Sequence, residues 1–232
     1  MLLGGLQKLT LIDYPGKIAA TVFTVGCNFR CPFCHNPELV LACHRAEHKL
    51  FPEEEFFAFI DKRKKKLDGI CITGGEPMIQ QDILEFIRKI KDREFLVKLD
   101  TNGAYPDVLK KAFDMELVDF VAMDIKDSIE HYSKACGVDV DTERIKLSVK
   151  LIRSSRVDYE FRTTAVPGIH TYSDFEKIGL WLKGSKKYVI QKYHDEGKIL
   201  DEKLRIRQKN KTINLEKIKQ KALPYFGHVE IH

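Results

Sequence analysis

The sequence GCNFRCPFCHN occupies residues 26–36 and holds three of the six cysteines, Cys27, Cys31 and Cys34. The C-x3-C-x2-C spacing puts three thiols on one short loop. There they can converge on an iron–sulfur cluster, because thiolates are soft ligands that suit iron. No fourth cysteine lies within the next few residues. An electron-transfer ferredoxin closes its cluster with four thiolates, so three ligands predict one iron left open for chemistry.

Other uses of these cysteines follow from the same spacing. Cys31 and Cys34 form a C-x2-C half-site for zinc, which Cys43, His44 or His48 could complete. A disulfide framework is the third possibility, but nothing else in the chain is typical of a secreted protein. The alternative to an enzyme is a non-enzymatic metal module, for zinc or for electron transfer. Metal analysis tests this, because stoichiometric zinc without iron or acid-labile sulfide would exclude the enzyme interpretation.

The cysteine loop resembles the cluster loop of radical S-adenosylmethionine (SAM) enzymes. Two further stretches, Cys34-His35-Asn36 and Asp13-Tyr14-Pro15-Gly16-Lys17, resemble the activating enzymes of glycyl-radical proteins, especially the activator of anaerobic ribonucleoside-triphosphate reductase. The resemblance implies that Cys27, Cys31 and Cys34 hold a [4Fe–4S] cluster that binds SAM. Several activases of this group carry extra cysteine motifs after the cluster loop. This chain has only Cys43 there, which favours a one-cluster enzyme.

Length and composition are those of an ordinary globular protein. The chain has 232 residues, of which 44% are hydrophobic and 31% charged, so residues 1–232 are expected to form one domain. Residues 1–11 are too short an apolar run for a signal peptide, and no stretch of about 20 apolar residues occurs. We therefore expect a reduced, cytoplasmic protein.

The charge balance is mildly basic, with 39 Lys and Arg against 34 Asp and Glu. Nucleic-acid binders usually show a stronger imbalance with interleaved aromatic residues, so nucleic acid is not an expected partner. The densest basic run is 62–66. We interpret it as the solvated end of a helix, where cations suit the macrodipole; the alternative is a docking site for an acidic partner.

Apolar runs and helical periodicities alternate along the chain. This alternation predicts βαβ units, hence a parallel sheet. Six units are fewer than the eight of a closed barrel. We therefore predict an α/β fold, an open, partial (β/α)6 TIM-type barrel, which the family resemblance also implies. The expected strands are 18–25, 70–73, 95–99, 118–123, 159–166 and 188–193; the expected helices are 53–66, 83–90, 106–113, 142–153, 173–182 and 215–222, and 229–231 is a short apolar tail.

Polar clusters follow consecutive predicted strands, at the edge where parallel α/β folds build their sites. One is Gly74-Gly75-Glu76-Pro77, whose glycines leave backbone amides and carbonyls open to close approach. It resembles the GGEP motif that in radical SAM enzymes holds the amino group of SAM. Glu76 then has a charge-assisted contact with that ammonium, although two glycines alone are more typical of a turn.

The next two clusters, Asp100-Thr101-Asn102-Gly103 and Asp124-Ile125-Lys126, resemble strand ends of pyruvate formate-lyase activating enzyme. The resemblance implies that Lys126 faces the SAM carboxylate or ribose, with Thr101 nearby and Asp124 in the same site. It also implies a monovalent cation beside that carboxylate, held by Asp100, Thr101 and Asp124 with a backbone carbonyl, because oxygen-only ligation suits a hard cation. Without the family, Asp100 would cap a turn and Lys126 would be solvated.

Other residues receive roles by the same resemblance. His194, after the last expected strand, would contact SAM, and Phe33 would be an aromatic wall near adenine. The segment 162–168 resembles the fifth strand of these enzymes, but no contact is assigned to it. Cys71 lies inside a strand and is interpreted as a small buried residue. No role is assigned to the isolated cysteines Cys43 and Cys136, apart from Cys43 as a spare ligand.

Two enzyme functions and one binding function remain open. In the first, the chain cleaves SAM reductively and removes hydrogen from a glycine of a large partner enzyme, most simply anaerobic ribonucleotide reductase, with flavodoxin or ferredoxin as electron donor. In the second, the same chemistry acts on a small molecule or RNA, as in 7-carboxy-7-deazaguanine synthase. The third is the metal module described above. The absence of a visible nucleophile or acid–base triad fits the enzyme hypotheses, because the cofactor carries the chemistry.

Overall fold

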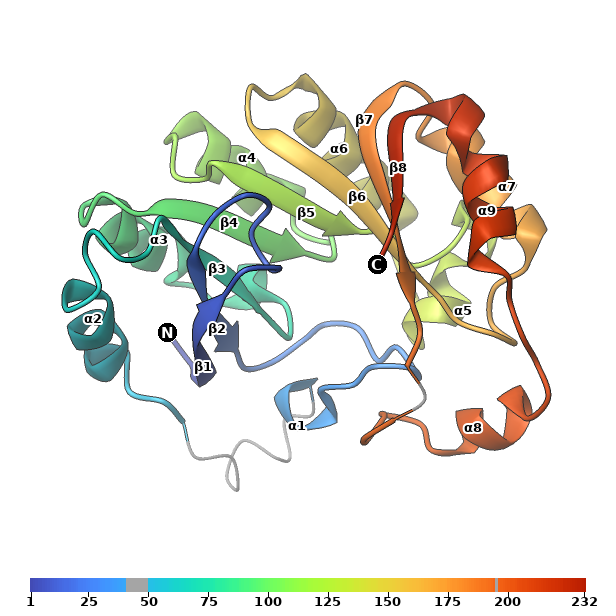
Figure 1. Cartoon of the computed structure of the whole chain (residues 1–232), viewed down its shortest axis with the longest axis horizontal. Coiled ribbons are helices and arrows are strands. Elements are labelled where there is room, and N and C mark those ends of the chain that lie inside the picture. Colours follow the sequence, from blue (N-terminus) through green and yellow to red (C-terminus); the bar gives the residue numbers. More distant parts are fainter. Residues whose placement is uncertain (41–49, 195) are drawn as a thin grey trace.

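Eight strands form one sheet in sequence order (Figure 1), as seen in a computed structural model that describes residues 1–40, 50–194 and 196–232. β1 is antiparallel to β2, and every later neighbouring pair is parallel. β1 and β8 end the sheet and do not pair with each other among the described residues, so the barrel stays open. The strands are β1 Leu3–Thr10, β2 Ala19–Thr24, β3 Gly69–Gly74, β4 Leu96–Thr101, β5 Phe120–Asp124, β6 Asp158–Ala165, β7 Ser185–Lys192 and β8 Phe226–Ile231.

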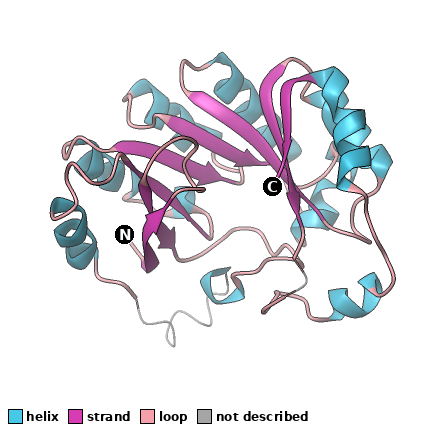
Figure 2. Ribbon diagram, viewed as in Figure 1, coloured by secondary structure: helices cyan, strands magenta, loops and turns pink. Residues whose placement is uncertain are grey.

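Helices lie around the outside of the curved sheet (Figure 2). Several begin with a capping signal. Thr171 and Asp174 form a capping box at the start of α7, and Pro106 begins α4 at the position where a missing N–H costs nothing. The helices are α1 Pro37–Val40, α2 Glu53–Asp61, α3 Ile83–Lys91, α4 Pro106–Asp114, α5 Tyr132–Cys136, α6 Thr142–Ser154, α7 Tyr172–Trp181, α8 Lys203–Gln208 and α9 Leu215–Ala222, with 3-10 turns at Pro77–Ile79, Ile129–His131 and Leu223–Tyr225.

The two faces of the sheet differ in chemistry. Residues such as Ile72, Leu99 and Met123 point toward the helices and are fully buried in the main core. The alternate positions, among them Lys98 and Asp100, point to the concave face, as the period of two in a strand requires. The apolar core therefore lies between sheet and helices, and the concave face is free to carry polar groups.

The predicted α/β open barrel is confirmed, although the sheet has more strands than the six expected. β1 was not predicted, because its Gly4-Gly5 start and polar middle give no strand signal. The expected tail 229–231 is the end of β8, whose His228 and Glu230 interrupt the apolar pattern.

The basic run 62–66 lies just beyond the helix that was expected to contain it. α2 ends at Asp61, and the run forms exposed turns that lead to the start of β3. It is solvated, as interpreted, but it sits at the edge of the sheet where the parallel strands begin. No helix in the described ranges is both long and apolar enough to cross a bilayer.

Candidate functional site

The cysteine loop, residues 26–36, connects β2 to α1 and is held from three directions. The Gly26 amide donates to the Leu39 carbonyl (2.6 Å), and the Arg30 amide donates to the Cys136 carbonyl at the end of α5 (2.8 Å). From the C-terminal part of the chain, the Leu200 amide donates to the Cys34 carbonyl (3.0 Å). These backbone bonds fix the loop over the edge of the sheet where the parallel strands end.

The approach of α5 to the loop depends on a glycine. Gly137 follows α5 with a φ of +66°, and a Cβ at this residue would lie 2.2 Å from the Arg30 carbonyl oxygen. Any other residue would therefore be strained and would collide with the loop backbone. The Arg30 guanidinium also donates to the carbonyls of Cys27 (2.6 Å) and Phe29 (2.7 Å). The first turn of the loop is thus closed by its own side chain.

The three loop cysteines line one cavity of about 240 Å³ together with the strand ends. Almost every residue predicted for the site lies on its wall. His194 is the exception, because its side chain is exposed and does not line the cavity. The predicted residues on the wall are Cys27, Cys31, Phe33, Cys34, Gly74, Gly75, Glu76, Asp100, Thr101, Asp124 and Lys126.

The backbone at the end of β3, around Gly74 and Gly75, is hydrogen-bonded to β2 and to the cysteine loop. The Gly75 amide donates to the Thr24 carbonyl (3.0 Å) and the Glu76 amide to the Gly26 carbonyl (2.8 Å). A Cβ on Gly75 would lie 2.0 Å from the Gly26 oxygen. The predicted open amides are therefore engaged, and the glycines are needed so that this strand end can touch the cysteine loop.

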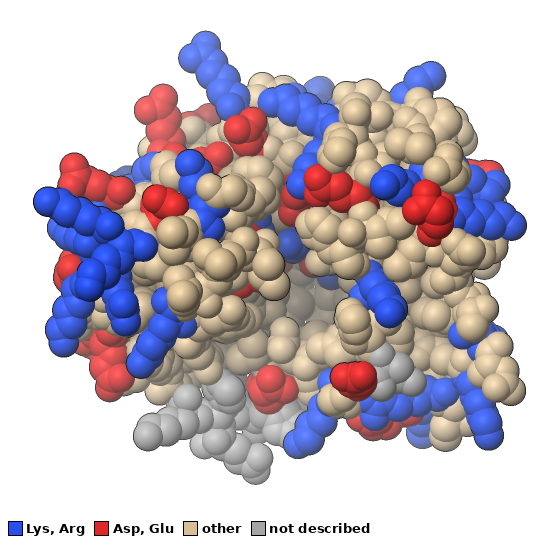
Figure 3. Space-filling view, viewed as in Figure 1, with Lys and Arg blue, Asp and Glu red and all other residues tan. Residues whose placement is uncertain are grey.

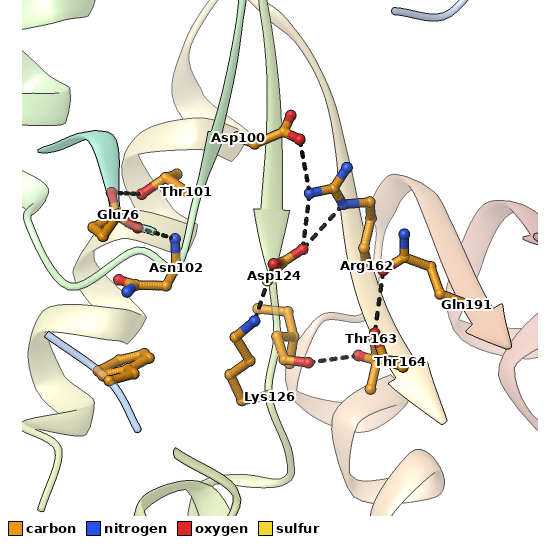
Figure 4. Close-up of polar contacts among 12 residues, drawn as sticks. Glu76, Asp100, Thr101, Asn102, Asp124, Lys126, Arg162, Thr163, Thr164 and Gln191 are labelled. Atoms are coloured by element: carbon orange, nitrogen blue, oxygen red, sulfur yellow. Dashed lines mark hydrogen bonds and ion pairs between the residues drawn. The ribbon is translucent and has the colours of Figure 1, made fainter. Parts of the chain in front are cut away.

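The Glu76 carboxylate is fully buried and accepts three hydrogen bonds; those from Thr101 and Asn102 are drawn in Figure 4. Thr101 Oγ1 (2.8 Å) and the Met78 amide (3.1 Å) donate to Oε1, and the Asn102 amide donates to Oε2 (2.7 Å). Burial raises the pKa of Glu76 to about 7 despite these bonds. The carboxylate therefore joins the ends of β3 and β4. The prediction gave Glu76 only a contact with the SAM ammonium and not this positioning role.

A chain of alternating charges crosses the ends of β4, β5 and β6. Asp100 accepts from Lys98 Nζ (2.5 Å) and lies 3.2 Å from Arg162 Nη2. The same guanidinium nitrogen lies 2.9 Å from Asp124, whose other oxygen pairs with Lys126 Nζ (3.0 Å; Figure 4). Although burial alone would raise the pKa of Asp124, Lys126 and Arg162 hold it well below its ordinary value.

These pairings do not fit the predicted monovalent cation. Asp100 and Asp124 already face lysine and arginine side chains. The Thr101 hydroxyl donates to Glu76 and accepts from the Gly103 amide (3.1 Å), so it points away from both aspartates. In this arrangement the three side chains do not converge, and Arg162 places a positive charge beside both aspartates, so the cation stays a prediction. Lys126 is ion-paired rather than solvated, and Asp100 does not cap a turn.

His194 acts through its backbone. Its carbonyl oxygen lies 2.6 Å from His35 Nε2, and the His35 ring packs on Tyr193 with 5.4 Å between ring centroids. His35, which carried no assigned role, lines the cavity instead. Phe33 is buried on the cavity wall, and the centroids of its ring and of the His170 ring are 6.3 Å apart. Its contact with adenine stays a prediction.

The thiols fit a bound metal cluster. Burial raises the pKa of Cys27 to about 12 and also raises that of Cys34. A buried thiolate needs a nearby positive charge, and a metal supplies it by displacing the proton. Three thiols around one cavity therefore suit a soft metal centre with an open position. Residues 41–49, with the predicted alternative ligands Cys43, His44 and His48, lie outside the described residues.

Two other cysteines occupy different surroundings. Cys71 is buried on β3 as expected, with the Lys98 ammonium 3.9 Å from its sulfur. Cys136 is not isolated, because its thiol lies beside that of Cys31 and lowers the pKa of Cys31. α5, which carries Cys136, was not predicted, so the proximity of this thiol to the cysteine loop was not expected either.

Several residues on the cavity wall, and Arg162 beside it, were not predicted from the sequence. Arg162 and Thr164 alternate along β6, a period that places both on the concave face. Asn102 donates through its side chain to Asn28 Oδ1 (2.8 Å), which links the end of β4 to the cysteine loop. The alternation of Arg162 and Thr164 along the segment 162–168 is the sequence signal that indicates their common face. The unassigned residues on the wall are Phe29, His35, Asn36, Val40, Thr73, Asn102 and Thr164.

The sequence is similar to those of known proteins. The model of the radical SAM superfamily matches residues 21–182. A candidate glycyl-radical enzyme activating enzyme of Methanocaldococcus jannaschii is 36% identical over 230 residues, which cover 96% of this chain and 93% of the relative. A pyruvate formate-lyase-activating enzyme of Clostridium pasteurianum is 27% identical over 232 residues, covering 94% of this chain and 93% of the relative.

A solved structure supports the fold. Streptococcus suis SuiB bound to S-adenosylmethionine superimposes with a TM-score of 0.63 at 13% identity. The match covers 89% of this chain, which spans about half the length of SuiB, 48%. At this identity the likeness concerns the fold alone. The superposition thus supports the open α/β barrel of this chain.

Proposed function

Because the chain belongs to the radical SAM superfamily and is a radical SAM enzyme of the glycyl-radical activating type, we propose that it cleaves SAM at a [4Fe–4S] cluster and activates anaerobic ribonucleoside-triphosphate reductase. One observation carries the proposal. The three cysteines share a single cavity with the strand ends that resemble SAM-binding motifs. Cluster and SAM would therefore meet in one place.

Different residues of this chain would bind the cluster and SAM. Cys27, Cys31 and Cys34 would ligate the cluster, while the ends of β3 and β5 would hold SAM. When bound, the cluster supplies the one electron that cleaves SAM, and the resulting carbon radical removes a hydrogen atom from the substrate. Lys126 is the cation on the cavity wall that suits the SAM carboxylate. Its bond to Asp124 keeps the ammonium in place.

Buried polar contacts support the position of this machinery. Glu76 joins β3 to β4, and Asn102 joins β4 to Asn28 in the cysteine loop. A displacement of about 1 Å at a reacting centre is enough to slow catalysis strongly. These hydrogen bonds therefore hold the strand ends and the cysteine loop at fixed positions relative to each other.

The partner is inferred from sequence stretches outside the cavity. Asp13-Tyr14-Pro15-Gly16-Lys17, which resembles the reductase activators, forms the turn between β1 and β2. Asp13 is held there by Thr21 Oγ1 (2.5 Å), and Tyr14 packs on Phe120 with 6.0 Å between ring centroids. Figure 3 shows a hollow near the centre of the face between this hairpin and β8, where a glycine loop of another protein could enter.

The test is anaerobic incubation of reconstituted enzyme, SAM and dithionite with purified anaerobic ribonucleotide reductase. Electron paramagnetic resonance should show a glycine-centred radical in the reductase, and its glycine-to-alanine variant should show none. Pyruvate formate-lyase serves as the competing substrate. If the radical forms in pyruvate formate-lyase alone, the lyase and not the reductase is the partner. SAM cleavage without a radical in either protein would favour a small-molecule or RNA substrate.

A further inference from the structure

Positive charge is concentrated around α8. Residues 198–211 contain six Lys and Arg against two acidic residues, Asp201 and Glu202, in a chain whose net charge is only +5. Lys203 and Lys209 are exposed, and Arg207 extends into solvent beside Asp201. Figure 3 shows the blue side chains of this region along the lower right of the molecule. We call this surface, residues 198–211, the α8 face.

The α8 face is directly joined to the cysteine loop. The Leu200 amide donates to the carbonyl of Cys34, and the Asp201 amide donates to that of Pro32, both at 3.0 Å. Ile199 and Leu204 are buried in the core cluster that also includes Cys31. Hydrogen bonds and packed side chains therefore lead from this surface to the ligands of the cluster.

An apolar side chain lies among these charges. Ile206 is 76% exposed and stands between Arg205 and Arg207. Protein pairs that exchange electrons typically meet through small interfaces, on the order of 1,200 Å² or less, where complementary charges steer the encounter. A basic surface with an exposed apolar residue suits a small acidic partner of this kind.

We infer that the α8 face is the docking surface for an acidic one-electron donor protein, which passes its electron to the cluster through the Pro32–Cys34 segment. The inference rests on the proposed function. One electron leaves the donor cofactor and enters the cluster, and no bond is made or broken and no proton has to move. Because electron-transfer rates fall steeply with distance, the donor must dock beside the cluster loop.

The other basic stretch does not meet this requirement. The run 62–66 leads into the beginning of β3, whereas the cysteine loop follows the end of β2. Since β2 and β3 are parallel, the two lie at opposite edges of the sheet. The central hollow of Figure 3 is a separate surface as well, so donor and glycine-bearing substrate can bind together.

The experiment compares two double charge reversals in the full, cluster-loaded protein. Lys203→Glu with Lys209→Glu changes the α8 face, and Lys62→Glu with Lys64→Glu makes the same charge change at the far edge. An acidic flavodoxin is the probe. Its oxidised form gives a dissociation constant by calorimetry at low and high salt, and its fully reduced form gives a second-order rate constant for cluster reduction by stopped-flow absorbance.

We expect affinity and rate to fall about tenfold at low salt in the α8 variant, and to change little in the far-edge variant. The affinity and the reduction rate should depend less on salt concentration in the α8 variant than in the wild type, and this change should not occur in the far-edge variant. Ile206→Ser, which adds no charge, should weaken binding at all salt concentrations. SAM cleavage driven by dithionite should be equal in all four proteins, since this small reductant needs no docking surface.

Unchanged flavodoxin affinity and reduction rate in the α8 variant would overturn the inference. So would a loss of radical formation in the glycyl-radical partner with dithionite as reductant, because the face would then bind the substrate enzyme. RNA binding that is lost with the same variant, while flavodoxin binding is kept, would also overturn it. Failure of dithionite to support SAM cleavage in the unmodified protein would instead refute the proposed function, while flavodoxin binding still tests the face.

Discussion

Thr101 Oγ1 donates a 2.8 Å hydrogen bond to Glu76 Oε1, and both residues are buried at the wall of the cavity. The bond joins the ends of β3 and β4 behind the cysteine loop. Thr101→Val keeps the shape of the side chain but leaves a buried carboxylate oxygen with one donor fewer. We expect a loss of about 1–3 kcal/mol in the free energy of unfolding, measured by denaturant titration.

Thr101→Ser is the matched control, because it keeps the hydroxyl and removes only a methyl group. It should keep most of the stability that the valine variant loses. If serine and valine variants are equally destabilised, the hydroxyl bond is not what holds the strand ends together.

The raised pKa of Glu76 predicts a specific pH dependence. Burial raises it to about 7 from an ordinary value of 4.5. The folded state then binds the proton more tightly than the unfolded state. Its contribution to stability is complete below pH 4.5 and is lost as pH rises to about 7. Between these limits the wild type should lose about 3 kcal/mol relative to Glu76→Gln, whose side chain does not titrate.

The measurement is the difference between the two unfolding free energies at each pH, in which the contributions of other carboxylates cancel. The glutamine variant also carries a constant penalty, because its amide nitrogen cannot accept from Asn102. A difference that stays constant from pH 4.5 to 7 would show that folding does not raise the pKa of Glu76.

Arg162 is predicted to stabilise the site by lying between two carboxylates. Arg162→Met leaves Asp100 and Asp124 without their shared partner, and breaking a buried ion pair costs about 3 kcal/mol. Arg162→Lys keeps the charge but loses the fork that contacts both, so an intermediate loss is expected. Thermal unfolding of the three proteins gives the order. If the methionine variant is as stable as wild type, Lys98 and Lys126 alone are sufficient to stabilise the charges of Asp100 and Asp124.

The sequence predicted the chemistry of the site better than its contacts. The cysteine spacing and the strand-end motifs placed Cys27, Gly75 and Lys126 on one cavity, because parallel strands end at a common edge. It could not show that Arg162 lies across from Asp100, since this pairing depends on the register of three strands. β8 was missed for a related reason, because inward-facing polar residues hide the apolar alternation of a strand at the end of a barrel.

The cysteine assignments predict iron content. Cys27→Ala, Cys31→Ala and Cys34→Ala should each lose the cluster and abolish SAM cleavage after anaerobic reconstitution. Cys71→Ala is the control, since Cys71 lies on β3 and does not line the cavity, and Cys43→Ala should also keep the cluster. Iron and acid-labile sulfide are measured together with 5′-deoxyadenosine. Cleavage retained in any of the first three variants would contradict the ligand set.

Gly75 tests whether the strand end and the cysteine loop are in obligatory contact. In Gly75→Ala the new Cβ would lie 2.0 Å from the Gly26 carbonyl oxygen, a backbone atom that cannot turn aside. The loop must move, so we expect about 1–3 kcal/mol of destabilisation and a lower cluster occupancy after reconstitution. Gly5→Ala is the matched control on β1, where no atom lies within 4 Å of the added carbon. Equal stability and iron content in the two variants would mean that the loop can yield at Gly26 without disturbing the cysteines.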